Sequence, residues 1–290
     1  MKQKMLHYNI KGLLTLSLLT ISLFAVAQRK ELTIYHTNDT HSRIEPIDIN
    51  SADKYAGYGG YIRRATAMKS LRKENADLLL FDCGDFSQGT PYYNLYKGDV
   101  EVKLMNLMAY DAVAIGNHEF DFGLENMARL FEMANFPIVC SNYDFKGTVV
   151  EPFVKSYIII ERAGLKIGVF GLSPRLEGLV QEAHYESVIY NDPIETANEV
   201  AKLLKVEKKC DLVICLSHLG LRPSALNQDS DQVLVRETAN IDVVLGGHSH
   251  TFMDEPEIVL NKEGKGVPIT QMGKNGVFLG KLKLTLEAEK

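Results

Sequence analysis

The stretch Gly116-Asn117-His118-Glu119-Phe120-Asp121 directly follows the apolar run Ala112-Val113-Ala114-Ile115. The apolar run has the length of a short buried strand, so the polar stretch begins where that strand is expected to end. It places an amide, an imidazole and a carboxylate within five residues. Taken alone, it is also compatible with a strand-to-loop turn that contains an incidental histidine. Four other strand-like runs also end in His or Asp, and this recurrence favours a functional edge of a sheet.

The N-terminal 27 residues differ from the rest of the chain. Three lysines precede an apolar run at residues 13–24, and Ala25-Val26-Ala27 is a small-residue cleavage pattern. A spanning helix needs roughly 20 apolar residues, so a stable membrane anchor is not expected. We therefore predict a signal peptide over residues 1–27, cleaved after Ala27, and a secreted or periplasmic protein whose remaining residues, 28–290, form one catalytic domain.

Charge and cysteine content restrict the classes of function. Residues 1–27 hold three of the 32 basic and none of the 37 acidic side chains, so the remainder carries a formal net charge of −8. This balance argues against a nucleic acid polymer as partner, and a bound phosphate would need local neutralisation by a metal or a few donors. The four cysteines lie in or beside apolar runs without metal-type spacing. We interpret them as core residues, although export would permit a disulfide between any pair.

Hydrophobic periodicity predicts an α/β protein. Strand-like runs alternate with segments of helical spacing, which favours a parallel sheet. Residues 157–161 and 166–170 are separated by a short turn, which indicates a hairpin. The predicted strands are 32–36, 78–82, 112–115, 137–140, 212–216, 242–245, 267–270 and 277–286, and the predicted helices are 61–72, 100–109, 124–133, 193–209 and 233–239.

The polar residues that follow these strands form a set with common chemistry. Because the carboxyl ends of parallel strands meet at one edge, side chains far apart in sequence can converge there. Imidazole, carboxylate and amide oxygen are ligands for Zn, Mn or Fe, and their number suits two ions sharing a carboxylate. Two such ions about 3.5–4 Å apart can hold a hydroxide and stabilise an in-line displacement, which indicates phosphoester hydrolysis. The set comprises Asp39, His41, Asp85, Asn117, His118, His218, His248 and His250.

Five motifs occur in order along the chain: Asp39-x-His41, Gly84-Asp85, Gly116-Asn117-His118-Glu119, His218 and Gly247-His248-x-His250. This set resembles that of the calcineurin-like metallophosphoesterases. The longer strings around residues 36–39, 84–91 and 117–123 are similar to the secreted bacterial 5'-nucleotidases of that superfamily. The resemblance covers nearly all of the chain after residue 27 and implies a four-layer α/β/β/α sandwich.

The resemblance also implies roles for the site residues. Asp85 would bridge two metal ions. One ion would be bound by Asp39, His41, Asp85 and His250, and the other by Asp85, Asn117, His218 and His248. His118 would face the substrate and stabilise the transition state or protonate the leaving oxygen, with Asp121 as its orienting partner. Glu119 would then have a structural role.

The chain departs from the family pattern in two respects. The last ligand is a glutamine in some nucleotidases and is His250 here, which should leave that metal site intact. Family nucleotidases usually continue into a second domain that grips the nucleotide, whereas this sequence stops at Lys290. We therefore expect that a separate chain supplies a nucleotide-binding domain. Tyr92, Tyr93 and Arg175 are expected in loops, where they are candidates for substrate contact.

The expected function is that of a secreted dinuclear-metal phosphohydrolase acting on 5'-nucleotides or related small phosphomonoesters. Cyclic nucleotides, sugar phosphates or sulfur esters are alternative substrates, because one metal core serves several leaving groups in this superfamily. A noncatalytic metal-binding subunit of a two-chain nucleotidase is the alternative from another class.

Overall fold

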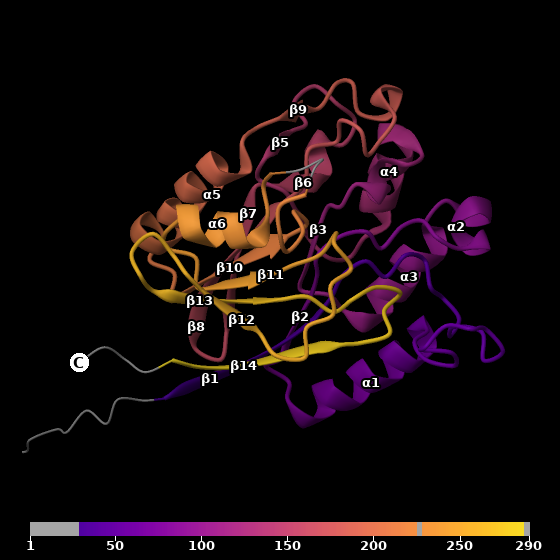
Figure 1. The fold of residues 1–290 in the computed structure, drawn as a ribbon, viewed down its shortest axis with the longest axis horizontal. Coiled ribbons are helices and arrows are strands. Elements are labelled where there is room, and N and C mark those ends of the chain that lie inside the picture. Colours follow the sequence, from indigo (N-terminus) through magenta and orange to yellow (C-terminus); the bar gives the residue numbers. More distant parts are fainter. Residues whose placement is uncertain (1–28, 225–227, 287–290) are drawn as a thin grey trace, which may run out of the picture.

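The computed structural model describes residues 29–224 and 228–286. The predicted signal peptide lies outside the described residues. Within them, α-helices and β-strands alternate over most of the chain, and two large sheets stack face to face (Figure 1). No helix in the described ranges is long and apolar enough to cross a membrane.

The first sheet contains six strands. They are β1 (Lys30–Thr37), β2 (Leu79–Asp82), β3 (Ala112–Ala114), β4 (Ile138–Val139), β6 (Val154–Lys155) and β14 (Gly280–Leu286). Their spatial order is β14-β1-β2-β3-β4-β6, and only β14 runs antiparallel to its neighbour. The carboxyl ends of β1, β2 and β3 therefore lie at one edge, as predicted.

The second sheet also contains six strands. They are β7 (Tyr157–Arg162), β8 (Leu165–Leu172), β10 (Leu212–Ser217), β11 (Val243–Leu245), β12 (Glu257–Leu260) and β13 (Gly266–Thr270). The order is β12-β13-β11-β10-β8-β7, with antiparallel edge strands β12 and β7. The predicted hairpin is confirmed: Ala163 and Gly164 both have positive φ, as a two-residue type I′ turn requires. A small ladder joins β5 (Tyr143–Asp144) to β9 (Ile189–Tyr190).

The described residues form six α-helices. They are α1 (Tyr61–Glu74), α2 (Pro91–Tyr96), α3 (Asp99–Met108), α4 (Gly123–Met133), α5 (Pro193–Lys202) and α6 (Asp231–Glu237). The last two begin at capping side chains, since Asp192 accepts hydrogen bonds from two amides of α5 and Ser230 accepts one from α6. The helix predicted over 193–209 is α-helical only as far as Lys202. A π-helical turn at Leu203–Glu207 follows it directly.

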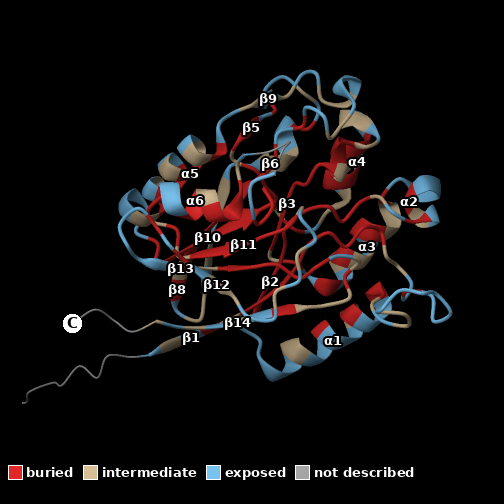
Figure 2. Cartoon of the chain, viewed as in Figure 1, coloured by how far each residue is buried: buried red, intermediate tan, exposed pale blue. Residues whose placement is uncertain are grey.

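Three buried layers hold these elements together. One lies between the sheets, where Phe81 of β2 and Ile214 of β10 belong to the same cluster. A second packs the first sheet against α1, α3 and α4, and a third packs the second sheet against α5 and α6. The central strands β2, β3, β10 and β11 are buried at every residue, which explains their apolar runs (Figure 2). The predicted four-layer α/β/β/α sandwich is confirmed.

Several details differ from the sequence prediction. Tyr92 and Tyr93 lie on the short helix α2 and not in a loop. Strand β12 was not predicted, because it is a short edge strand with half of its residues exposed. The four cysteines are free and buried, so the core interpretation is confirmed and no disulfide joins them. Arg175 does lie in a loop, where it stacks on Tyr190.

Two glycines let the loops after β2 and β3 approach each other. A Cβ on Gly84 would lie 2.5 Å from the Gly116 amide nitrogen, and a Cβ on Gly116 would lie 2.2 Å from Asp85 Oδ1. Only glycine fits at such close approaches. This contact brings the Gly84-Asp85 motif beside the Gly116–Asp121 stretch.

Candidate metal centre

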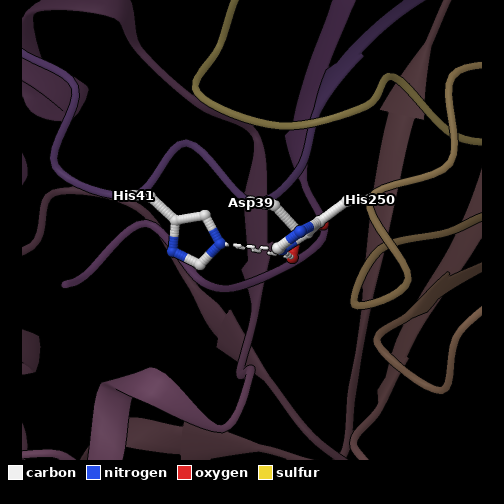
Figure 3. A group of neighbouring side chains, drawn as sticks. All are labelled: Asp39, His41 and His250. Atoms are coloured by element: carbon white, nitrogen blue, oxygen red, sulfur yellow. Dashed lines mark hydrogen bonds and ion pairs between the residues drawn. The ribbon is translucent and has the colours of Figure 1, made fainter. Parts of the chain in front are cut away.

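A first group of metal-ligating side chains joins the loops that follow β1 and β11. Asp39, His41 and His250 present ligand atoms that all lie within 4.8 Å of one another (Figure 3). His41 Nε2 lies 2.9 Å from His250 Nε2, and His250 Nε2 lies 3.3 Å from Asp39 Oδ1. Three donor atoms thus point toward one position.

A second group joins the loops that follow β2, β10 and β11. Asp85, His218 and His248 also present ligand atoms within 4.8 Å of one another. His218 Nε2 lies 3.0 Å from Asp85 Oδ2, and the His218 and His248 ring centroids are 5.2 Å apart. His218 comes from the second sheet and Asp85 from the first, so this group exists only because the two sheets pack together.

The two groups abut. The His248 amide donates to Asp39 Oδ2 at 2.9 Å, and His218 Nε2 lies 3.9 Å from Asp39 Oδ1. The His118 ring centroid is 5.5 Å from that of His41. The structure therefore gathers all the sequence-predicted site residues at one edge of the sandwich.

The tautomers of two histidines follow from their partners. His218 Nδ1 lies 2.6 Å from the Cys83 carbonyl, and His41 Nδ1 lies 3.3 Å from the Ser87 carbonyl. A carbonyl only accepts, so each Nδ1 carries a proton and each Nε2 faces the site, where it can offer a lone pair to a metal once it is deprotonated. Metal-ligating histidines are oriented in this way.

The backbone at the site is strained. Left-handed φ angles cost non-glycine residues roughly 1–3 kcal/mol each and concentrate at functional sites. Five of the seven predicted ligands adopt them: Asp39 (49°), His41 (45°), Asp85 (57°), His248 (72°) and His250 (53°). The fold holds these residues in a conformation that their side chains disfavour.

Two side chains hold the strained loops in place. Glu119 accepts hydrogen bonds from the amides of Gly116, Asp85 and Ser87 at 2.7, 2.9 and 3.1 Å. These contacts agree with the structural role predicted for Glu119. Asn38 donates to Asp39 Oδ2 at 2.6 Å and accepts from the Met272 amide at 2.8 Å. Sequence reasoning missed Asn38, although its position directly before Asp39 in the first motif was a signal.

The donor set fits divalent metal ions. Two imidazole nitrogens that face each other at 2.9 Å need an electrophile, either a proton or a metal, between them. Among the described residues, no hydrogen-bond partner is found for the buried side-chain oxygen of Asn117. A buried acceptor without a donor is costly, and a metal ion would satisfy it. Nitrogen and oxygen ligands of this kind are those that Zn, Mn and Fe accept.

Opposite charges on Asp85 and His218 stabilise the centre. Burial alone would raise the pKa of Asp85, yet the adjacent His218 holds that pKa well below its usual range. Burial likewise opposes protonation of His218, but Asp85 and Asp39 raise its pKa to about 10. Asp85 and His218 therefore form a buried ion pair without metal, and a metal bound there would release the His218 proton.

His118 stands beside the two groups and makes different contacts. Its Nδ1 lies 2.9 Å from Asp121 Oδ2, and its amide donates to Asp85 Oδ1 at 2.9 Å. Burial lowers the pKa of His118, but the hydrogen bond to Asp121 and nearby carboxylates outweigh it and raise the pKa to about 9. The side chain is 29% exposed. A partly exposed, protonated imidazole is available to a bound molecule.

The buried carboxyl group of Asp231 should make the stability of the fold depend on pH. Burial raises its pKa to about 7, although the Ser217 hydroxyl donates to it at 2.5 Å. A carboxyl whose pKa is raised on folding favours the folded state while protonated, so stability falls as pH rises from about 4 through 7. Between pH 5 and 8 in EDTA, the Tm of the wild type should therefore fall by roughly 5–10 °C more than the Tm of Asp231→Asn. Thermal unfolding of both proteins checks this.

The exposed Asp254 supplies the control for that comparison. Asp254→Asn should reproduce the wild-type dependence of Tm on pH. If Tm depended on pH equally in the wild type and in Asp231→Asn, ionisation of Asp231 would not reduce the stability of the fold.

The α/β/β/α sandwich and its two abutting His/Asp groups define a metallophosphoesterase-type protein. Residues 32–252 match the family described as Calcineurin-like phosphoesterase, and the chain belongs to this family. The predicted resemblance is thereby confirmed.

Sequence identity to curated proteins shows which metallophosphoesterases the chain resembles. The chain is 35% identical to a snake venom 5'-nucleotidase of Crotalus adamanteus, over 89% of this chain and 45% of the relative. It is 32% identical to a 5'-nucleotidase of Rattus norvegicus, over 95% and 50%. The chain spans about half the length of these relatives. It is a 5'-nucleotidase-like metallophosphoesterase.

Solved structures agree with this assignment. A 5'-nucleotidase precursor from Thermus thermophilus superposes with a TM-score of 0.80 at 30% identity, over 89% of this chain and 52% of that one. The NAD nucleotidase of Haemophilus influenzae superposes with a TM-score of 0.78 at 26% identity, over 90% and 54%.

Proposed function

We propose that this protein is a secreted dinuclear-metal phosphohydrolase that releases phosphate from 5'-nucleotides or related small phosphomonoesters. The observation that carries the proposal is the abutment of the two ligand groups, with Asp85 and Asp39 between their histidines. The names of the relatives support the nucleotide substrate.

Two divalent ions would be held by side chains from both sheets. We assign Asp39, His41, Asp85 and His250 to one ion, and Asp85, Asn117, His218 and His248 to the other. Two ions in such a centre activate water and neutralise charge on the phosphoryl oxygens. Asp85 suits the bridging position because one carboxylate offers two oxygens.

His118 would complete the reaction as a proton donor. Asp121 holds Nδ1 at 2.9 Å, so Nε2 is the nitrogen left to face a substrate. As the bond between phosphorus and the leaving oxygen breaks, the Nε2 proton would pass to that oxygen. General acid catalysis of this kind contributes typically 10²–10⁴-fold to the rate.

Secretion is proposed from the sequence. Lysines, a short apolar run and Ala25-Val26-Ala27 form the pattern of a cleavable signal peptide. N-terminal sequencing of the exported protein should begin at Gln28. An intact N-terminus on exported protein would contradict the cleavage.

Metal dependence tests the reaction. Protein purified and loaded with Mn or Zn should release phosphate from nucleoside monophosphates, and EDTA should abolish this release because the ligands alone provide no Lewis acid. Restored metal should restore turnover. A parallel panel of cyclic nucleotides, sugar phosphates and sulfur esters tests the alternative substrates. A metal-loaded preparation that is inert toward the whole panel would refute the enzyme assignment and leave the noncatalytic subunit.

A further inference from the structure

The loop that follows β11 carries two predicted ligands, and its backbone is tightly turned. The Ser249 amide donates to the Gly247 carbonyl at 2.9 Å, which closes a three-residue γ-turn around His248. His248 has a φ of 72°, close to that of the positive-φ γ-turn, which is rare and strained. His250, two residues later, is also left-handed, with a φ of 53°. The loop therefore needs stabilising contacts from outside itself.

The side chain of Gln271 supplies such contacts. Gln271 directly follows β13 and is fully buried. Its Nε2 donates to the Gly247 carbonyl at 2.6 Å, which is the same carbonyl that closes the γ-turn. Its Oε1 accepts from the Thr251 amide at 2.6 Å and from the Ser249 hydroxyl at 3.0 Å. One side chain thus brackets residues 247–251, which include both histidines.

The two ends of the bracket require a donor and an acceptor on the same side chain. A backbone carbonyl only accepts and a backbone amide only donates, so Nε2 must face Gly247 and Oε1 must face Thr251. A side-chain amide provides both groups at once. An apolar side chain of the same length would leave both backbone groups without these partners.

The histidines of this loop depend on their backbone more than His218 does. The side chain of His218 is fully buried and its Nδ1 contacts the Cys83 carbonyl, whereas the side chain of His250 is 35% exposed. Packing therefore fixes the His250 ring less firmly than the His218 ring. The direction of the His250 ring follows from the backbone that Gln271 holds.

The segment after β13 also contacts the loop after β1. The Met272 amide donates to Asn38 Oδ1 at 2.8 Å, and the Asn275 amide donates to the Asp39 carbonyl at 2.7 Å. Residues 271–275 therefore join ligand-bearing loops of the two sheets, although they contribute no predicted ligand themselves.

We propose that Gln271 is a positioning residue of the metal centre, which sets the directions of His248 and His250 without binding metal. The inference rests on the proposed function, in which these two histidines bind different ions. Loss of the Gln271 hydrogen bonds should therefore weaken the binding of both ions. Partners that orient metal ligands from outside the coordination shell typically contribute about 10- to 100-fold to metal affinity.

Gln271→Met tests the assignment, because it keeps the length of the side chain and removes its hydrogen bonds to the loop. The Kd for Mn²⁺, measured by calorimetry on metal-free protein without substrate, should rise about 10- to 100-fold at both sites. The visible absorption spectrum of the Co²⁺-saturated variant should also differ from that of the wild type, because this spectrum depends on the arrangement of the ligands around the ion.

Asn106→Leu is the matched control, because Asn106 makes the same kind of bracket away from the site. Its Nδ2 donates to the Met133 carbonyl at 2.8 Å, and its Oδ1 accepts from the Asn135 amide at 2.7 Å. Asn106 lies in the last turn of α3, before β3 begins, whereas the ligand groups follow the carboxyl ends of strands. This variant should lower Tm and leave both the Kd for Mn²⁺ and the Co²⁺ spectrum unchanged.

Two results would overturn the assignment. One is an unchanged Mn²⁺ affinity in folded Gln271→Met, and the other is an equal loss of affinity in Asn106→Leu, which would reflect general destabilisation. If Gln271→Met does not melt cooperatively, Gln271→Asn decides, because its shorter amide cannot span Gly247 and Thr251 and the same rise in Kd is expected. A wild type that binds Mn²⁺ at both sites but releases no phosphate would instead refute the proposed function, and the comparison of Mn²⁺ affinities would still decide the role of Gln271.

Discussion

His118→Ala should lower kcat for nucleoside monophosphates by about 10²–10⁴-fold while the protein keeps both metal ions. The imidazole contacts Asp121 and lies beside the two ligand groups, but the structure does not group it with either of them. Its loss removes the proposed proton donor and leaves the donor atoms of the proposed ligands in place. Steady-state kinetics and metal content by mass spectrometry, measured on the same preparation, check this result.

His184→Ala is the matched control for that substitution. His184 ends a 3-10 turn at Glu182–His184, outside both ligand groups, and its loss should change neither kcat nor metal content. If His118→Ala instead lost a metal ion, His118 would be a ligand. If it kept full activity, the leaving oxygen would obtain its proton from another group.

Asp85→Asn should reduce the bound metal from two ions per chain to fewer than one and lower kcat/KM by about 10³-fold or more. Asparagine tolerates the left-handed backbone at this position (φ 57°) as well as aspartate does. The substitution therefore removes the charge that would balance two cations without adding backbone strain. Metal content after dialysis and phosphate release at saturating Mn check the two parts of this prediction.

Two variants sharpen the interpretation of Asp85→Asn. Asn117→Ala removes a ligand of one proposed site only and should retain about one ion per chain. Asp254→Ala removes an exposed carboxylate and should retain two. Full metal occupancy in Asp85→Asn would show that Asp85 does not bridge. A protein that no longer melts cooperatively would restrict the comparison to Asn117→Ala, which must then lose one ion.

Much of the fold followed from local sequence pattern. Strands buried on both faces must be largely apolar, so β2, β10 and the part of β8 after Lys166 were visible as continuous runs. Helix α2 has only six residues, which is too few for a helical period to be recognised. Edge strand β12 has only four residues, and its Ile258 and Leu260 are exposed, so its short apolar run does not have the pattern of a buried strand. Tertiary packing decided both of these elements.

The candidate site was predictable in its membership and not in its geometry. The Gly116–Asp121 stretch contains residue types whose chemistry limits what they can bind. The order of the motifs along the chain identified the other candidate ligands. Sequence by itself therefore determined the fold class, the family and the candidate ligands.

Only the tertiary structure decided how those side chains meet. His218 and His248 reach Asp85 and Asp39 because the two sheets bury a common apolar layer between them. The Glu119 carboxylate and the Asn38 amide hold the strained loops through contacts with residues as distant in sequence as Met272. A cavity beside His250 joins loops more than 190 residues apart. Such contacts depend on packing free energy summed over the whole chain, and no local pattern encodes them.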